Sequence, residues 1–452
     1  MHKEISPLDG RYYGRLGDLA ELFCEQSLMR YRCFVELAYL EVLADTGRFF
    51  RLEETERAAI RKERESFGDR EYENIKRIEA GTAHDVMACV EHLRERFPAR
   101  AEWIHFALTS EDVNNLAYGL LFRDYAAKLQ LPLLGRVLWH LMELARRWQD
   151  IPFPAKTHGQ PASPTTAGKE LAVFLSRLLR QYRQLKSFRF RGKLNGATGN
   201  WSAFAAADPD FDWIAFSGKF VGSLGLDFNP ATTQIEDHDG WSEYFSLVRR
   251  INTILLDLDV DAWEYISRGF FVQRKKEGEV GSSTMPHKVN PIRFENSEGN
   301  LVLANSLLST FSERLCHSRM QRDLSDSTVI RNVGVALAHS HLAWKETLAG
   351  LDRIEIDGEA CRAELEREPQ LLAEPYQIVL RAAGLKDAYG QLKELTRGRA
   401  VSIADFHRLL DSCAVDESRK SRLRKLDVPG YVGLSRRVCR EALAAAEKEL
   451  GE

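Results

Sequence analysis

Long stretches of helical apolar spacing constrain the fold of this chain more than any other feature of its sequence. From Trp241 onward, apolar side chains recur every three or four residues, at Phe245, Val248, Ile251, Leu255, Leu258, Ala262 and Tyr265. This is the period of one face of an α-helix, and a helix of about 30 residues is about 45 Å long. Further segments also read as helices, at 112–148, 171–185, 301–315 and 334–350. Several long amphipathic helices predict an all-α fold built around a bundle with coiled-coil-like packing.

The composition agrees with a helical globular protein. The 452 residues include only 14 prolines and 30 glycines, which favours long helices over many short strands. The net charge of −3 argues against a dedicated nucleic-acid-binding protein, which would normally carry a basic domain. The sequence contains no run of about 18 apolar residues and no apolar signal-peptide core near its start. We therefore expect no membrane association and no nucleic-acid partner.

Cysteine usage indicates a reducing compartment. The chain has seven cysteines, an odd number, and none of them forms a C-x-x-C pair. We expect reduced thiols, mostly in helix cores, of a cytoplasmic protein. The nearest approach to a metal-binding motif is His339-x-His341, which is too small a ligand set for a structural zinc ion. No metal and no organic cofactor is expected.

Two breaks in the helical pattern suggest domain limits. Phe97-Pro98 interrupts the first helical region, and the long periodic segments end near Leu351-Asp352. The residues after this second break form shorter helical patterns that are rich in Arg, Lys and Glu. These breaks predict an N-terminal helical domain (1–98), a central long-helix bundle domain (99–351) and a C-terminal helical domain (352–452).

Three polar segments interrupt the expected bundle. Gly281–Pro291 concentrates serine, threonine, histidine and lysine between glycines and prolines that forbid a continuous helix. Ile151–Pro164 carries four prolines and His158, and Arg191–Asn200 carries three glycines. Loops at the ends of a bundle can converge in space and often carry function, so we expect chemistry where these segments meet.

Several motifs fit either a structural role or a binding site. Asp85, after His84, either caps a helix or lies beside an anion site at the helix N-terminus. Thr109 and Ser110 begin a capping-box pattern, but their hydroxyls and amides can equally bind carboxylate oxygens. His158 is either a loop histidine bonded to the backbone or an acid–base group held in a proline-rich frame.

The Gly281–Pro291 segment fits neither of two common catalytic motifs. It lacks the strand–turn–helix context of a G-x-S-x-G nucleophile and the spacing of a phosphate-binding P-loop. We interpret it as a hydroxyl- and cation-rich lid that closes over an anionic ligand. Arg322, Ser327 and Arg331, between two helical runs, would also suit a phosphate.

The same segment resembles the signature of a known superfamily. Gly281-Ser-Ser-Thr-Met-Pro-His-Lys-Val-Asn-Pro291, followed by Glu295-Asn-Ser-Glu-Gly-Asn300, is similar to the signature of the fumarase/aspartase superfamily. Within it, Met285-Pro-His-Lys288 points to the adenylosuccinate lyase family. The resemblance to the long bacterial form runs essentially end to end, with matches at Ser6–Tyr12, Ala83–Val86, Phe106–Asn115, Thr157–Ala162, Gln234–His238 and Arg322–Arg331.

The resemblance implies a β-elimination that releases fumarate from succinylated nucleotides in purine biosynthesis. The expected substrates are adenylosuccinate, giving AMP, and succinyl-aminoimidazole carboxamide ribotide, giving AICAR. Ser282 is implied as the base and His158 as the acid that protonates the departing nitrogen. Chemistry alone would favour a histidine base, because a hydroxyl needs an oxyanion stabilised by amides and cations. Glu295 is implied as the partner of His158, and His84 as a second active-site histidine.

Further positions match the substrate-binding residues of the family: Arg11, Tyr12, Asp85, Thr109, Ser110, Gln234, Ser283, Lys288, Asn290, Asn296, Arg322, Ser327 and Arg331. The substrates carry a dicarboxylate and a phosphate. We therefore expect four cationic side chains to lie in one pocket, namely those of Arg11, Lys288, Arg322 and Arg331. Two positions depart from the family pattern. Ala83 stands where Asn is frequent, and Lys156 stands where Arg often precedes Thr-His-Gly-Gln.

The resemblance also implies an assembly. The family fold has three helical domains, and its long central helices form the core of a homotetramer in which each active site draws residues from three subunits. The alternatives are argininosuccinate lyase, fumarase or a cycloisomerase-type member, and a non-catalytic helical scaffold. His287 and Asp326–Arg331 argue against the related enzymes. A scaffold would have no need for the full set of Ser282, His158, Lys288 and Glu295.

Overall fold

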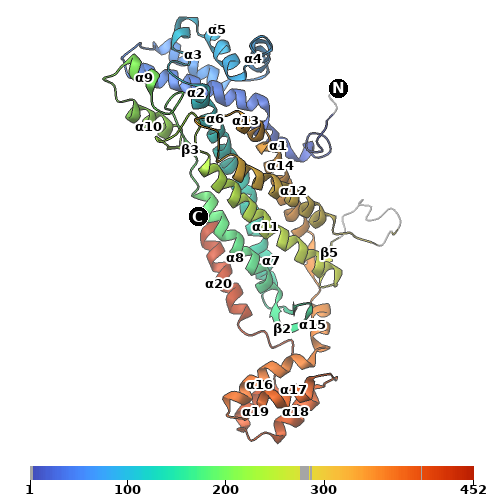
Figure 1. The fold of residues 1–452 in the computed structure, drawn as a ribbon. Helices are drawn as coiled ribbons and strands as arrows, with labels where there is room; N and C mark the ends of the chain where they lie inside the picture. Colours follow the sequence, from blue (N-terminus) through green and yellow to red (C-terminus); the bar gives the residue numbers. More distant parts are fainter. Residues whose placement is uncertain (1–3, 275–284, 286–287, 399, 452) are drawn as a thin grey trace. The chain divides into compact units, whose positions relative to one another are not determined.

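The computed structural model of the protein describes residues 4–274, 285, 288–398 and 400–451. The chain forms two compact units. Unit 1 comprises Met1–Leu134, Gln181–Thr253 and Gly299–Ala343, and unit 2 comprises Gly135–Arg180, Ile254–Glu298 and Trp344–Glu452. The long helices contribute residues to both units: α7 (Leu131–Arg147), α8 (Ala167–Lys186), α11 (Asp239–Ser267), α12 (Ile292–Arg314) and α14 (Val333–Leu351) (Figure 1).

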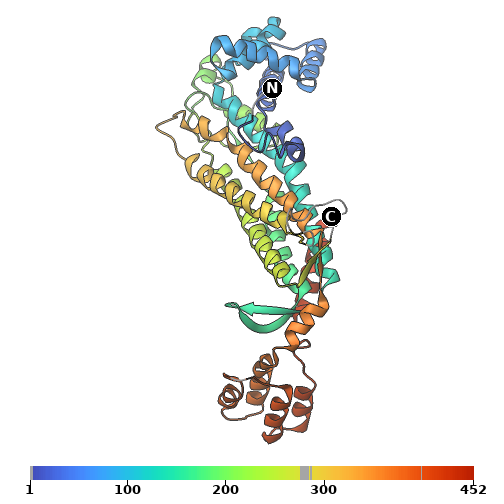
Figure 2. The same cartoon turned by 90° about the vertical axis from the view of Figure 1, so that its right-hand side faces the viewer.

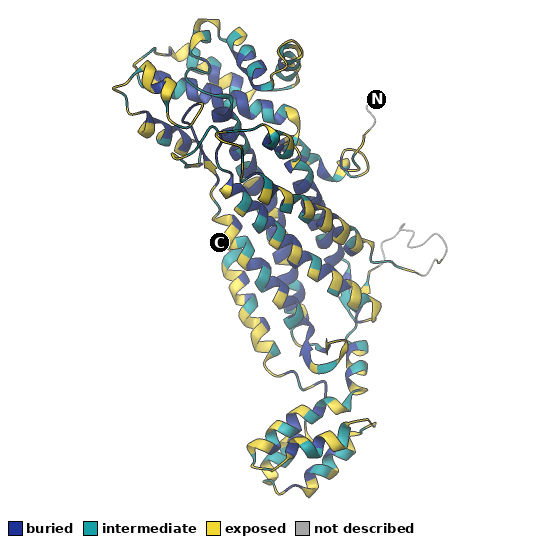
Figure 3. Ribbon diagram, viewed as in Figure 1, coloured by how far each residue is buried: buried dark blue, intermediate teal, exposed yellow. Residues whose placement is uncertain are grey.

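These helices confirm the long apolar periodicity. Helix α11 is 29 residues long, and its apolar positions Phe245, Val248, Ile251, Leu255 and Leu258 are all buried. Helices α7, α8, α11 and α12 each have a buried and an exposed face, whereas α14 has buried or partly buried residues along its whole length (Figure 3). Polar side chains also cross the buried faces, as where the Asn252 amide donates to Ser340 Oγ at 2.9 Å. No helix in the described ranges is long and apolar enough to cross a membrane.

Unit 1 contains most of the N-terminal helices. Its remaining elements are α1 (Tyr13–Phe23), α2 (Glu25–Asp45), α3 (Glu54–Glu65), α4 (Asp69–Thr82), α5 (Asp85–Arg96), the 3₁₀ helix η1 (Pro98–Trp103), α6 (Ser110–Tyr125), the π-helical turn η2 (Ala126–Gln130), β3 (Arg191–Gly192), α9 (Ser202–Ala207), α10 (Trp213–Ser223), β4 (Asp227–Phe228) and α13 (Ser325–Ile330). Strands β3 and β4 pair in parallel. The segment expected to be helical at 112–148 is therefore α6, η2 and α7 in succession.

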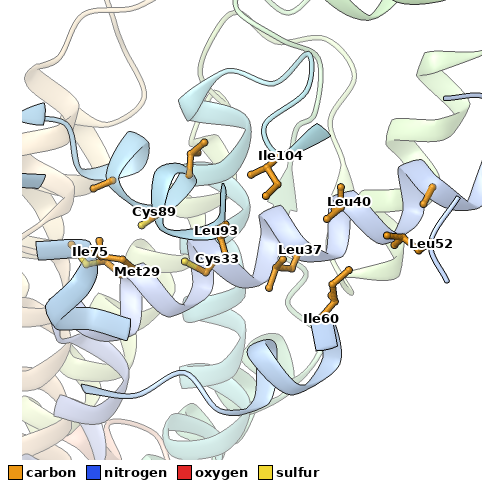
Figure 4. Close-up of a cluster of buried hydrophobic side chains, with 13 residues drawn as sticks. Met29, Cys33, Leu37, Leu40, Leu52, Ile60, Ile75, Cys89, Leu93 and Ile104 are labelled. Atoms are coloured by element: carbon orange, nitrogen blue, oxygen red, sulfur yellow. The ribbon is translucent and has the colours of Figure 1, made fainter. Parts of the chain in front are cut away.

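One core of unit 1 forms around α2. Its Met29, Cys33, Leu37 and Leu40 recur at helical spacing and meet side chains of α3, α4 and α5 (Figure 4). Cys33 and Cys89 are both buried there, so these two thiols lie in helix cores as expected. This packing fixes α2 against α5 and so positions the N-terminus of α5.

Unit 2 contains short antiparallel strand pairs and the C-terminal helices. These elements are β1 (Pro152–Thr157), β2 (Gln160–Thr166), β5 (Phe271–Gln273), β6 (Ile354–Ile356), α15 (Gly358–Glu366), the 3₁₀ helix η3 (Pro369–Leu372), α16 (Ala373–Ala382), α17 (Ala388–Thr396), α18 (Ile403–Ser412), α19 (Glu417–Arg424) and α20 (Ser435–Leu450). A second core, with Tyr376, Leu392, Phe406 and Leu423, joins α16 to α19.

The proline-rich segment Ile151–Pro164 forms a β-hairpin rather than an irregular loop. Strand β1 pairs with β2, and Thr157 faces Gln160 across a two-residue turn. His158 and Gly159 form this turn with φ values of 53° and 72°, the left-handed pair that suits a tight hairpin. Figure 2 shows the hairpin projecting from the helices beside it. The expected breaks at Phe97-Pro98 and Leu351-Asp352 coincide with helix ends, whereas the three domain ranges stay a prediction.

Candidate functional site

Unit 1 contains a cavity of about 550 Å³ that brings many of the predicted site residues together. Its wall includes the predicted residues His84, Asp85, Thr109, Ser110, Gln234, Arg322, Ser327 and Arg331. These come from the start of α5, the start of α6, the segment before α11 and the segment around α13. The convergence of segments that are distant in the sequence makes this cavity the candidate site.

The start of α5 supplies a histidine and a carboxylate. His84 is the N-cap, and its Nδ1 accepts a hydrogen bond from the Met87 N–H at 3.2 Å. Asp85 is the first helical residue, so the cap is His84 and not Asp85. Asp85 Oδ2 lies 3.0 Å from Arg32 Nη2 and 3.2 Å from Arg331 Nη2. The capping bond leaves Nε2 of His84, whose side chain is about half exposed, available at the cavity.

Neighbouring positive charges keep Asp85 ionised although its carboxyl group is partly buried. Burial by itself would raise the pKa of Asp85, but the charges of Arg32 and Arg331 and the Val86 N–H hold it below its ordinary value. Arg32 is almost fully buried and also donates through Nε to Asn114 Oδ1 at 2.9 Å. Asp85 therefore acts as the anchor that holds two guanidinium groups beside the cavity.

The start of α6 presents hydroxyls to the cavity. Thr109 is the N-cap, and its backbone N–H donates to Asp112 Oδ2 at 2.9 Å, so the expected capping role is present. Thr109 and Ser110 also line the cavity, which means that the structural and the binding interpretations are compatible. Asp112 Oδ1 lies 2.8 Å from Lys193 Nζ, and both side chains are completely buried. The glycine-rich segment that follows β3 is thereby attached to the helix start.

Arg322 lies at the centre of a polar cluster. Its Nη1 donates to Gln234 Oε1 at 3.2 Å, and its Nη2 lies 3.4 Å from Ser327 Oγ and 3.2 Å from Glu111 Oε2. Glu111 is buried, and this burial raises its pKa above the ordinary value although Arg322 opposes the shift. These contacts hold the guanidinium of Arg322 at the cavity wall.

Sequence reasoning assigned no role to several residues of this wall. Arg32, Glu111, Asn114, Tyr118 and His238 all line the cavity. Glu111 and His238 lie within motifs that resemble the family, which was the signal available for them. For Arg32 no such motif was available, and its burial became visible only in the structure.

Two predicted residues of unit 1 lie outside this wall. Arg11 is exposed and Tyr12 is the N-cap of α1, after a turn in which the Tyr12 N–H donates to the Pro7 carbonyl at 2.9 Å. Arg331 lines both the candidate site and a second cavity of about 400 Å³ beneath this N-terminal turn. The structure therefore does not place Arg11 and Tyr12 among the residues of the candidate site.

The other predicted residues belong to unit 2 or lie outside the described residues. His158 is exposed at the tip of the β1–β2 hairpin. Glu295 is exposed on α12 and accepts a hydrogen bond from Trp263 Nε1 at 3.1 Å. The backbone N–H of Lys288, an exposed residue, donates to the Met285 carbonyl, and Asn290 and Asn296 are partly buried. Ser282, Ser283 and His287 lie outside the described residues.

The electrostatics of the cavity suit an anionic ligand. Arg322 and Arg331 line it, and two helices of ordinary length, α5 and α6, begin at its wall with their positive ends. In the described part of the chain, no three His, Cys, Asp or Glu side chains are grouped so that they could hold a metal ion. The side chains that line the cavity can form hydrogen bonds, transfer protons and stabilise charge.

Comparison with known proteins identifies the family. The sequence matches the lyase family over residues 10–305 and the adenylosuccinate lyase C-terminal family over residues 318–432. It is 44% identical to the adenylosuccinate lyase of Vibrio cholerae over 444 residues, which cover 95% of this chain and 96% of that protein. It is 43% identical to the adenylosuccinate lyase of Escherichia coli over 438 residues, with the same shares covered. The chain belongs to the adenylosuccinate lyase family.

Solved structures agree with this family at the level of the fold. The fumarate lyase of Mesorhizobium sp. BNC1 has a TM-score of 0.79 at 18% identity and covers 95% of this chain and 97% of its own. The 3-carboxy-cis,cis-muconate lactonizing enzyme of Pseudomonas putida gives a TM-score of 0.78 at 20% identity, over 96% and 98% of the two chains. The predicted resemblance to the adenylosuccinate lyase family, the lyase class and the all-α fold are thus confirmed.

Proposed function

We propose that this protein acts as an adenylosuccinate lyase. It releases fumarate from adenylosuccinate to give AMP, and from succinyl-aminoimidazole carboxamide ribotide to give AICAR. The observation that carries the proposal is the identity of more than 40% to adenylosuccinate lyases over nearly the whole of both chains. The cavity adds physical support, because its arginines, hydroxyls and helix N-termini suit the carboxylates and phosphate of these substrates.

In the proposed reaction, a proton leaves the succinyl carbon and the adjacent carbon–nitrogen bond breaks. Ser282 takes the proton, the electron pair of the C–H bond forms the double bond of fumarate, and the departing nitrogen receives a proton from His158. Glu295 orients His158, and His84 contacts the substrate. The hydroxyl of Ser282 needs its negative charge stabilised while water is excluded, and Lys288 is the cation of the same segment that we assign to this task.

The remaining predicted residues hold the substrate in this proposal. Asp85, Thr109, Ser110, Gln234, Arg322, Ser327 and Arg331 do so from the cavity described above. Arg11, Tyr12, Ser283, Lys288, Asn290 and Asn296 complete the set. No metal or organic cofactor takes part in this scheme.

We further propose a homotetramer with active sites shared between subunits. His158 lies exposed at the tip of the β1–β2 hairpin, where its side chain is accessible to another subunit. The described hydrogen bond of Glu295 is to Trp263 and not to His158, so we assign the pairing of Glu295 and His158 to different subunits. Apolar side chains are exposed on long helices, and Val302 and Leu303 on α12 are 52% and 54% exposed.

We also propose a cytoplasmic location. All seven cysteines are free thiols, which fits a reducing compartment.

The first test is a substrate comparison with the purified protein. Ultraviolet absorbance would follow adenylosuccinate, with argininosuccinate and fumarate assayed alongside. Conversion of adenylosuccinate to AMP and fumarate is expected, and the variant Ser282→Ala should bind substrate but lose turnover by several orders of magnitude. Activity on another substrate without conversion of adenylosuccinate would refute the assignment, and near-normal turnover of the variant would remove Ser282 as the base.

A further inference from the structure

Glu111 is a buried carboxylate in a cavity that suits anions. It is the second residue of α6, only 5% of its surface is exposed, and it lines the cavity wall. Its Oε2 lies 3.2 Å from Arg322 Nη2 and 3.4 Å from Asn114 Nδ2. A negative charge at this point opposes the binding of an anionic ligand to Arg322. The cavity therefore carries its own carboxylate on the guanidinium that an anionic ligand has to reach.

His238 is the second unusual group of this wall. Its ring stacks on Trp241 with centroids 4.2 Å apart, and its backbone is left-handed, with φ 63°. Nδ1 lies 3.2 Å from the carbonyl oxygen of Leu315, which can only accept, so Nδ1 carries the proton and Nε2 is an acceptor. The residue is 1% exposed, and Nε2 is buried without a hydrogen-bond partner among the described residues. A buried acceptor in this condition calls for a donor.

Glu111 and His238 line the wall of the same cavity. Burial lowers the pKa of His238. Glu111 opposes this shift most strongly, followed by the hydrogen bond to the Leu315 carbonyl and then by Asp326 and Asp237. Around Glu111, Arg322, His238 and Lys193 favour the charged carboxylate, whereas burial and Asp326 disfavour it. An anionic ligand that engages Arg322 removes the main counter-charge of Glu111 and adds a negative charge nearby. Both changes favour a proton on the pair formed by Glu111 and His238.

We propose that Glu111 is a positioning residue that changes partner when the substrate binds. In this structure it holds Arg322, and when an anionic group of the nucleotide engages Arg322, Glu111 turns to Nε2 of His238. One proton from solvent enters at the same time and lies between the carboxylate and the imidazole. No other bond forms or breaks. This change of partner gives the buried Nε2 of His238 a hydrogen bond. It also moves the negative charge of Glu111 away from Arg322. This inference rests on the proposed function, since AMP is the ligand that tests it.

The exchange predicts proton uptake on binding, which calorimetry measures directly. AMP would be titrated into the full-length protein at pH 8 in buffers of different ionisation enthalpy. At this pH the phosphate, with a second pKa of about 6, is already almost fully dianionic. We expect wild-type protein to take up about one proton more per bound AMP than Glu111→Gln. The exposed carboxylate variant Glu65→Gln should match the wild type.

A second variant keeps the test decisive if Glu111→Gln folds poorly. His238→Gln supplies an amide N–H to the freed carboxylate without a proton, so it should bind AMP with the proton uptake largely lost. A merely structural role for either residue would change affinity or yield but not the proton count. Unchanged uptake in a variant that still binds AMP would overturn the exchange. Wild-type protein that neither binds AMP nor converts adenylosuccinate would instead overturn the proposed function, and the exchange with it.

Discussion

At the scale of single residues, Ala83 carries a backbone conformation that most side chains avoid. It ends α4 with φ 51° and ψ 29°, and its N–H donates to the Glu79 carbonyl. Besides glycine, asparagine adopts this left-handed region most readily. The family resemblance implies that Asn is frequent at this position, and the left-handed backbone gives a physical reason for that expectation. The alanine preserves the turn at a cost in stability.

The variant Ala83→Asn should therefore stabilise the protein by about 0.5–1 kcal/mol, a part of the left-handed penalty of alanine. Urea denaturation would measure the change. Ala383→Asn is the matched control, because Ala383 ends α16 with φ −86° and has no such penalty to relieve. An equal gain in both variants would contradict the backbone explanation.

At the scale of elements, Lys193 fixes the start of α6. It is fully buried with Asp112 at 2.8 Å, and its Nζ also donates to the Gly196 carbonyl at 3.2 Å. Lys193→Met would leave the carboxylate buried without its counter-charge, which typically costs about 3–5 kcal/mol. The surface pair of Lys128 and Asp124 is the comparison, because Lys128 is 64% exposed and Lys128→Met should cost less than about 1 kcal/mol. Denaturation midpoints that fall equally in the two variants would exclude this role.

Asp259 makes the middle of α11 sensitive to pH. Thr347 Oγ1 lies 2.9 and 3.1 Å from its two carboxylate oxygens, and complete burial raises the pKa of Asp259 well above its ordinary value. The folded state keeps this proton at a pH where the unfolded chain has lost it. Stability from this group is therefore complete below the ordinary aspartate pKa of about 4 and falls as the pH rises through the raised value.

Asp259→Asn should remove that loss, because the amide carries no charge to bury. The expected result is a smaller fall in thermal midpoint between pH 5 and pH 8 than in the wild type. Asp45→Asn, at a 58% exposed carboxylate beside Arg57, should keep the wild-type dependence. A slope that does not change in Asp259→Asn would show that this carboxyl is not the source.

At the scale of the whole molecule, the exposed apolar residues of α12 bear on assembly. Leu303 is 54% exposed in the single chain, and a glutamate there would bury a charge in the proposed tetramer. Leu303→Glu should therefore shift the molar mass from light scattering towards smaller species and lower activity at least tenfold. Ile378→Glu, at an equally exposed position on α16, should leave the mass unchanged. Retention of the wild-type mass by Leu303→Glu would place any assembly contact elsewhere.

Shared active sites predict complementation. His158→Ala and Ser282→Ala should each be inactive, but mixed tetramers would contain some sites with both groups intact. Partial activity is expected after the two variants exchange subunits, measured by the release of fumarate, with each variant treated alone as the reference. Persistent inactivity after exchange has been verified by mass labels would argue for sites built within one subunit.

Part of the site was accessible to sequence reasoning because its residues lie in short motifs. His84, Asp85, Thr109, Ser110 and Arg322 were singled out individually, and the structure brings them to one cavity. Their convergence was not predictable from spacing, since it depends on the packing of α2, α5, α6 and α13. Buried partners such as Arg32 and Lys193 remained unassigned, because a charged residue does not reveal its counter-ion along the sequence.

The sequence by itself determined the long helices and the family, because apolar periodicity and motif residues are local signals. It did not reveal that the proline-rich segment pairs as a hairpin with His158 in its turn, since strand pairing is set by the partner strand and the turn geometry. Only the tertiary structure placed Glu111 on Arg322 and left Nε2 of His238 without a partner. Burial and the distance between charges decide those states, and both arise only when separate helices pack together.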